Sequence, residues 1–161
     1  MQKIVTNLWF DGRVEEALDF YTSVFPDARV TSVSRYTEAG PGTKGDILVA
    51  NVELYGQTFT IINGGPGFPH SPAMSLLVNC ETQAEVDELW EKLSDGGSKD
   101  QCGWLTDRFG VSWQIVPTAL ERLMQDGDEE KVTRVTEALL GMKKLDIATL
   151  ERAYRGEPVK P

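Results

Sequence analysis

The chain has 161 residues, of which 40% are hydrophobic and 25% are charged, a composition typical of a folded globular protein and far from that of a disordered chain. Its 16 basic and 25 acidic residues give a net charge of −9, which disfavours binding to nucleic acid or to an anionic membrane surface. The sequence contains no pattern of a transmembrane helix or a secretion signal, so we expect a cytoplasmic protein.

The first part of the chain predicts one helix and four strands. β-Branched and aromatic side chains mark the strands, and apolar residues at spacings of three and four mark the helix, which Pro26 ends. The pair Tyr55-Gly56 joins the last two strands as a hairpin. In chain order, the predicted ranges are strand 3–10, helix 14–25, and strands 29–36, 46–54 and 57–63.

The same order begins again after the Gly/Pro-rich connector GGPGFPHSP. Thr82 is predicted to cap a helix, with Glu85 as its capping-box partner, and Asp95-Gly96-Gly97 end it. Strands are predicted at 73–79 and around the segments CGWLTD and VSWQIV. An internal repeat whose halves each expose an apolar face predicts that the two halves close on each other.

The remainder of the chain, 118–156, predicts a helical extension of three amphipathic segments. Asp128 and Asp146 stand where they can cap the second and third helices, next to the positive end of the helix dipole. We therefore predict an α+β fold in a single domain spanning 1–161. Its parts are module one at 3–63, module two at 73–117 and the C-terminal extension at 118–156.

Three segments resemble one known family, namely LWFDGRVEEALDFYTSVFPDARV, GGPGFPHSPAMSLLVNCETQAEVDELWEKLSDGG and QCGWLTDRFGVSWQIVP. They are similar to the PhnB-like branch, labelled 3-demethylubiquinone-9 3-methyltransferase domain proteins, of the vicinal oxygen chelate superfamily, also called the glyoxalase/bleomycin-resistance/dioxygenase superfamily. The resemblance implies paired βαβββ modules whose curved mixed sheets form a cup. It also implies a homodimer.

Metal-dependent members of that superfamily place one ligand on the first strand and one on the last strand of each module. The resemblance puts these positions near Thr6 or Asn7, at 60–62, at 73–75 and at Gln114. None holds His, Asp or Glu, and neutral groups do not compensate for removing water from a hard cation. We therefore expect no metal and no cofactor.

Gln114 alternates with Ser112 and Val116, so these three side chains are predicted to share one strand face. Trp113 and Ile115 then point the other way and pack under a helix. Gln114 has two interpretations: a ligand contact, or a polar residue that only satisfies neighbouring strands.

The leading hypothesis is a metal-independent binding protein for a small organic ligand, with no catalytic residue. The predicted pocket contacts are Gln114, Trp104, Thr60, Trp9 and Thr6. Tyr36, Phe59 and Phe109 are further aromatic residues that either line such a pocket or belong to the core.

The competing hypothesis is a lyase, isomerase or oxygenase-type enzyme that recruits a metal through His70 and nearby carboxylates. His70 lies in a Pro/Gly loop, where a surface residue is more common than a ligand. Cys102 as a nucleophile beside His70 is a second enzymatic alternative. Carboxylates close to strand ends are candidate acids or bases, although such residues are usually turn formers: Asp11, Glu53, Asp100 and Asp107.

Methyl transfer is disfavoured, because the chain lacks the alternating βαβ order and the glycine-rich first turn of a nucleotide-binding sheet.

Overall fold

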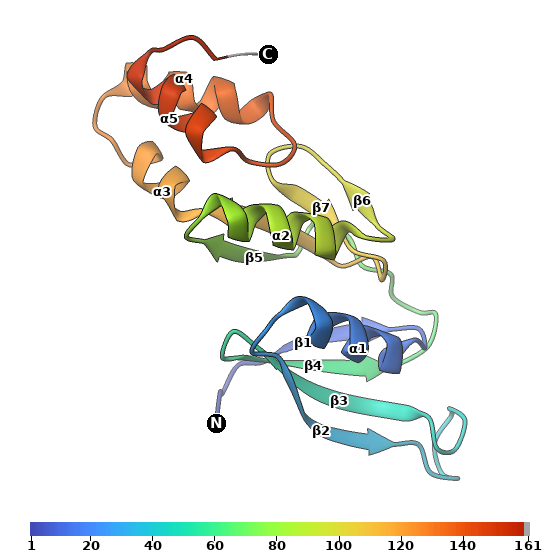
Figure 1. The fold of residues 1–161 in the computed structure, drawn as a ribbon. Helices are drawn as coiled ribbons and strands as arrows, with labels where there is room; N and C mark the ends of the chain where they lie inside the picture. Colours follow the sequence, from blue (N-terminus) through green and yellow to red (C-terminus); the bar gives the residue numbers. More distant parts are fainter. Residues whose placement is uncertain (160–161) are drawn as a thin grey trace. The chain divides into compact units, whose positions relative to one another are not determined.

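The computed structural model describes residues 1–159 and divides into two compact units, one before and one after the junction of His70 and Ser71. Each unit contains a four-stranded sheet with one helix packed on it (Figure 1). The predicted α+β class is confirmed, as is the repeat of one strand and one helix followed by further strands. The closure of the two halves into a cup stays a prediction.

In the first unit the strand order is β1-β4-β3-β2, with β1 parallel to β4 and the other pairs antiparallel. Its elements are β1 (Thr6–Phe10), α1 (Val14–Val24), β2 (Arg29–Arg35), β3 (Ile47–Leu54) and β4 (Gln57–Asn63). The first strand begins at Thr6, later than predicted. The side chain of Gln2 explains the difference, because its Oε1 accepts the backbone N–H of Thr58 at 3.1 Å.

α1 covers one face of this sheet with an apolar stripe. Ala17 and Tyr21 are almost completely buried, and the sheet residues beneath the helix alternate along β3 and β4, where Ala50 pairs with Ile61 and Val52 pairs with Phe59. Phe59 is therefore a core residue, which is one of the two roles considered for it. We call the opposite face of each sheet its helix-distal face.

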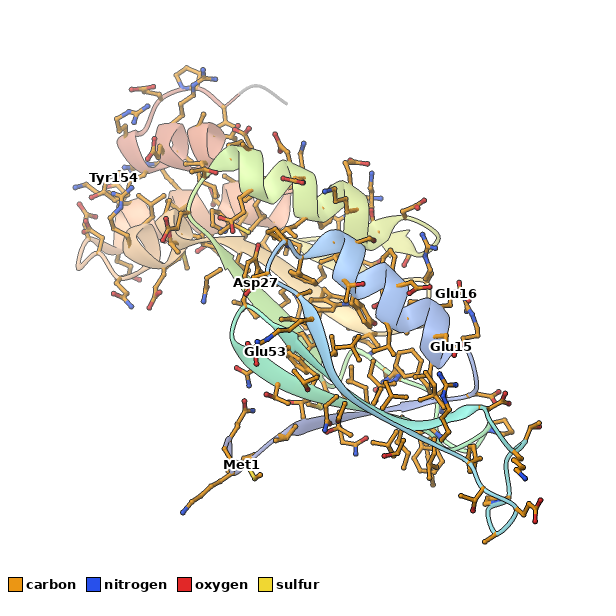
Figure 2. The ribbon with its side chains drawn as sticks, turned by 60° about the horizontal axis from the view of Figure 1, so that its bottom comes forward. Met1, Glu15, Glu16, Asp27, Glu53 and Tyr154 are labelled. Atoms are coloured by element: carbon orange, nitrogen blue, oxygen red, sulfur yellow. The ribbon has the colours of Figure 1, made fainter. Side chains whose placement is uncertain are left out.

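The outer strand β2 has exposed side chains along its whole length. Its pairing with β3 is interrupted twice, between Val30 and Ser32 and again between Ser34 and Arg35. Arg35 is also tied to α1, because its guanidinium contacts the carboxylate of Glu15 at 3.2 Å. Figure 2 labels Glu15 on the first turn of this helix.

The second unit repeats the arrangement with the strand order β5-β8-β7-β6, again with its first and last strands parallel. Its elements are β5 (Ser75–Cys80), α2 (Gln83–Ser94), β6 (Ser98–Lys99), β7 (Trp104–Thr106) and β8 (Ser112–Pro117), followed by α3 (Thr118–Met124), α4 (Glu129–Leu140) and α5 (Ile147–Arg155). The two-residue strand β6 was not predicted. It is too short to show a pattern of alternation.

The predicted helix caps are confirmed. Thr82 Oγ1 accepts the N–H of Glu85 at 3.2 Å, although the Glu85 carboxylate returns to the N–H of Glu81 and not to that of Thr82. Asp128 and Asp146 accept backbone N–H groups at the starts of α4 and α5.

The three C-terminal helices pack around a small core of their own, made by Leu123, Val135 and Leu150. Tyr154, labelled on α5 in Figure 2, donates its hydroxyl to Asp126 Oδ2 at 2.5 Å. Within residues 1–159, no helix has both the length and the apolar character needed to cross a lipid bilayer.

Candidate functional site on the helix-distal faces

Trp104 and Gln114 are direct cross-strand partners on the second sheet. β7 and β8 run antiparallel with these two residues in register, and Gln114 pairs on its other side with Leu77 of β5. The Gln114 side chain is fixed by a hydrogen bond from its Nε2 to Ser75 Oγ at 2.9 Å. An indole, a carboxamide and an aliphatic side chain therefore form one row across three strands, and Leu77 at its end is 50% exposed.

The intervening residues of β8 face α2. Trp113 is 2% exposed and Ile115 is completely buried. This confirms the predicted alternation, which places Ser112, Gln114 and Val116 on the helix-distal face.

The helix-distal face of the second sheet carries no ionisable side chain at its register positions. The neighbouring cation, Lys99, points toward α2, where its Nζ pairs with the carboxylate of Glu91 at 2.8 Å. The face instead presents neutral donors and acceptors beside aliphatic groups. By strand register and alternation its members are Ser75, Leu77, Asn79, Ser98, Trp104, Thr106, Ser112, Gln114 and Val116.

The first sheet has a hydrogen-bonded polar row on its own helix-distal face. Thr60 Oγ1 donates to Asn51 Oδ1 at 2.7 Å, and Asn51 Nδ2 donates to Ser32 Oγ at 2.9 Å. Asn7 stands beside Thr60 in the parallel pairing of β1 with β4. The row therefore crosses all four strands, from the exposed amide of Asn7 on β1 to Ser32 on the edge strand β2.

Trp9 lies on the same face, one step along the strands from this row. It pairs in register with Ile62, and its indole N–H donates to the carbonyl of Gly65 at 2.8 Å. The ring of Phe68 meets it edge to face at 4.9 Å between centroids. A Cβ on Gly64 would lie 2.1 Å from the indole, so the loop after β4 is shaped to fit Trp9.

Thr6 does not share this face. It pairs with the buried Phe59, and alternation along β1 places it with Leu8 and Phe10 on the side of α1. Trp9 and Thr60 thus lie on the helix-distal face of the first sheet, and Trp104 and Gln114 lie on that of the second sheet. Thr6 lies on the opposite face of the first sheet, away from both pairs. Asn7, the other first-strand candidate, occupies the helix-distal position.

The sequence and fold match one family of known proteins. A family model described as 3-demethylubiquinone-9 3-methyltransferase matches residues 2–116. The solved structure of the PhnB protein from Bacillus cereus is 42% identical, with 73% of this chain and 100% of that chain aligned at a TM-score of 0.67. The chain belongs to this PhnB-like family.

More distant structures share the fold of this PhnB-like chain. Protein PA1353 from Pseudomonas aeruginosa is 23% identical over 73% of this chain and 98% of its own, with a TM-score of 0.60. The fosfomycin resistance protein FosX from Listeria monocytogenes, solved with Mn(II) and sulfate, is 17% identical over 76% of this chain and 99% of its own, with a TM-score of 0.56. No curated protein gives a significant match.

The donor groups of this PhnB-like chain do not fit a divalent cation. The positions to which the resemblance assigned ligands hold neutral side chains, and Gln114 already donates to Ser75. Across residues 1–159, no three His, Cys, Asp or Glu side chains lie close enough together to hold a metal ion. Hydroxyls and amides alone bind such ions weakly, because they supply no negative charge.

Three of the remaining candidates have contacts that describe their surroundings. His70 stacks edge to face on Phe10 at 5.8 Å between centroids, and its Nε2 is buried with no hydrogen-bond partner among the described residues. Glu53 pairs with Arg29 at 3.1 Å. Tyr36 donates its hydroxyl to the carbonyl of Asn63 at 2.5 Å, so it joins the residue after β2 to the end of β4.

Two important residues were missed or undervalued by sequence reasoning. Asp107 is 2% exposed and accepts three hydrogen bonds within the β7–β8 connection, a role that its place near a strand end did not reveal. Gln83, at the first turn of α2, binds the backbone of the C-terminal extension through both of its amide atoms. No sequence motif indicates a long-range bond of this kind.

Proposed function

We propose that this chain is a metal-independent binding protein for a neutral small organic molecule, with contacts to Gln114 and Trp104 on the second sheet. Thr60 and Trp9, on the first sheet, stay predicted contacts of that sheet alone. The observation that supports this most is the register pairing of Trp104 with Gln114 on a face without ionisable groups. A Trp ring binds planar or apolar surface, and a carboxamide adds a directional donor and acceptor.

The fixed orientation of Gln114 favours a ligand over a purely structural role. Its Nε2 has one hydrogen bond to Ser75, which leaves the Oε1 acceptor and the second N–H to meet another molecule. A site that combines apolar surface with a few fixed polar groups is typical of small-molecule recognition. Because the face carries no counter-charge, an ionic ligand would lose hydration without compensation, and we therefore propose a neutral ligand.

The name of the family suggests methyl transfer, but the fold of this chain gives that activity no support. Nucleotide-type methyl donors are typically bound at the strand ends of a doubly wound sheet, next to a glycine-rich first turn. Here each sheet is built from one βαβββ unit, and the first turn, Asp11-Gly12-Arg13, contains one glycine.

The proposal is tested by the melting temperature of the purified protein in the presence of two kinds of ligand. Neutral aromatic probes such as benzamide and phenol at millimolar concentration should raise it, because any ligand that binds only the folded state stabilises that state. Mn²⁺, Ni²⁺, Zn²⁺ and EDTA should leave it unchanged. Stabilisation by a metal that chelation reverses would favour the metal-recruiting enzyme instead.

A substitution at Gln114 sharpens this test. Gln114→Glu introduces a carboxylate beside Ser75 and Trp104, neither of which supplies a second negative charge. We expect added metal to leave the stability of this variant unchanged, because one carboxylate does not make a site. Gln125→Glu, on the exposed surface of the extension, is the matched control for the added charge.

The proposal includes a homodimer, as the family resemblance implies. Light scattering should then give a mass about twice the 17.9 kDa of the chain, as expected for a symmetric pair. A mass equal to that of the single chain would contradict the dimer. The binding proposal would still depend on the ligand experiment alone.

A further inference from the structure

The turn that leads into Trp104 has an unusual backbone. Cys102 and Gly103 both have positive φ angles, 59° and 82°, and the N–H of Trp104 donates to the carbonyl of Gln101 at 3.1 Å. Two successive positive φ angles inside such a bond are typical of a type I′ turn. Its first central position favours Gly, Asn or Asp, so a cysteine there is strained and depends on its surroundings.

The C-terminal extension supplies those surroundings. The N–H of Cys102 donates to the carbonyl of Met142 at 2.8 Å, and the N–H of Gly103 donates to the carbonyl of Lys143 at the same distance. The two N–H groups at the centre of the turn are thus both bound by one short segment that follows α4.

Leu145 adds a steric contact to these bonds. It is 1% exposed, and a Cβ placed on Gly103 would lie 3.1 Å from its side chain and 2.9 Å from the carbonyl oxygen of Ile115. The turn is therefore enclosed between the extension and β8. The carbonyl of Gly103 completes the enclosure by accepting the N–H of Ile115 at 2.8 Å, next to Gln114.

Gln83 attaches the same segment to α2. Its Nε2 donates to the carbonyl of Leu145 at 3.0 Å, and its Oε1 accepts the N–H of Ile147 at 2.8 Å. The Gln83 side chain thus donates one bond to the backbone of the extension and accepts one from it, as a neighbouring β-strand would. A nearby ion pair between Lys144 and Asp87 at 2.8 Å lies on the surface, where such pairs contribute little.

The geometry points to the segment 142–147 as a clamp that positions Trp104 for ligand binding, with Gln83 and Leu145 as its positioning residues. The consequence for the ligand rests on the function proposed above, whereas the clamp itself does not. The segment lies beyond the region matched by the family model, which ends at residue 116. The extension thus holds a residue of the candidate site from outside the matched range.

Native-state hydrogen exchange measured by NMR tests the clamp in the unmodified protein. If the extension holds the turn, the amides of Cys102 and Gly103 exchange through the same opening reaction as the amides of α5, and low concentrations of urea accelerate both sets in parallel. Exchange of these two amides that is independent of α5 would overturn the proposal.

The variant Gln83→Ala tests the role of the side chain. The exchange of Cys102 and Gly103 should accelerate by about tenfold, the effect expected from losing hydrogen bonds that hold a local structure closed. The Trp104 indole N–H resonance, assigned with Trp104→Phe, should also shift. Gln125→Ala removes an amide whose bond partner among the described residues is Glu121, within the extension, so it should change neither signal.

Two results from the variant would contradict the clamp. One is unchanged exchange at Cys102 and Gly103, and the other is an equal acceleration at every amide of the second unit, which indicates general destabilisation. Titration of wild type and Gln83→Ala with benzamide then separates the two proposals. No binding to wild type counts against the proposed function alone, whereas equal binding by both proteins, with altered exchange, counts against the positioning of the ligand site.

Discussion

The indole N–H of Trp113 donates to the carboxylate of Asp107 at 2.9 Å, and both side chains are 2% exposed. The other carboxylate oxygen accepts the backbone N–H groups of Phe109 and Val111 at 2.9 and 3.0 Å. One buried acid thus closes the connection between β7 and β8 and anchors the indole beneath α2. The strand that carries Gln114 is held in place from its opposite face.

Replacing Asp107 by Ala should destabilise the protein by about 2 to 4 kcal/mol, because three donors lose a carboxylate acceptor and the bonds from Val111 and Trp113 are buried. Urea unfolding followed by circular dichroism measures the change. Asp95→Ala is the control, since it removes a carboxylate whose ion pair with Arg108 is largely exposed, and it should cost about 1 kcal/mol or less. Equal losses in the two variants would contradict the structural role of Asp107.

Gly64→Ala tests the fit of the β4 loop against Trp9. The new methyl group would lie within 2.1 Å of the indole, so the ring or the loop must move, at a cost of about 1 to 3 kcal/mol. Gly67→Ala, where a Cβ meets no atom within 4 Å, should have no comparable effect. Unfolding curves give the stabilities, and a shift of the Trp9 indole resonance in the first variant only would locate the change.

Tyr154→Phe should make the stability of the protein less dependent on acid, in a direction set by the pKa of Asp126. The hydroxyl of Tyr154, and secondarily the N–H of Asp128, lowers the pKa of Asp126. A depressed pKa stabilises the fold above the unfolded value of about 3.9, and this contribution is lost as the pH falls through the folded value. The variant should therefore lose more stability at pH 7 than at pH 2.

Tyr36→Phe is the control for that experiment. Its hydroxyl donates to the carbonyl of Asn63, a group that does not titrate, so the stability lost should be the same at both pH values. Thermal unfolding at the two pH values measures both variants. A loss for Tyr154→Phe that is likewise independent of pH would refute the coupling to Asp126.

Cys80 should resist thiol reagents in the folded protein. Burial, with a smaller contribution from the charge of Glu85, raises the pKa of its thiol to about 12. At pH 8 the reactive thiolate is then about one part in ten thousand. Peptide mapping after treatment with iodoacetamide should show unmodified Cys80 in the native state and full modification in urea. Rapid labelling of Cys80 in the native protein would contradict this prediction and would mean that the end of β5 opens readily.

Local chemistry made much of the fold predictable from the sequence. Thr82, Asp128 and Asp146 act within three residues of their own positions, and the alternation along β8 decides which side chains meet α2. The order of elements followed from patterns of the same short range. The strand β6 was not predicted, because two residues show no period.

The candidate site was less predictable, since it depends on which strands become neighbours. The faces of Trp9 and Thr6 are decided by the pairing of β1 with β4, and a shift of one residue exchanges the two faces. Trp104 lies opposite Gln114 because of the register between β7 and β8. The sequence of either strand alone does not reveal that register. The bonds of Gln83 join residues more than 60 positions apart, beyond the reach of any local pattern.

The two interruptions in β2 bear on how this protein behaves in a crowded solution. A regular outer strand offers an uninterrupted line of backbone donors and acceptors onto which a strand of another molecule can add. In β2 the pairing shifts twice within seven residues, and such bulges distort the edge that an incoming strand would need. The exposed valines there are therefore poor starting points for fibril growth, and the protein should remain dispersed at high concentration.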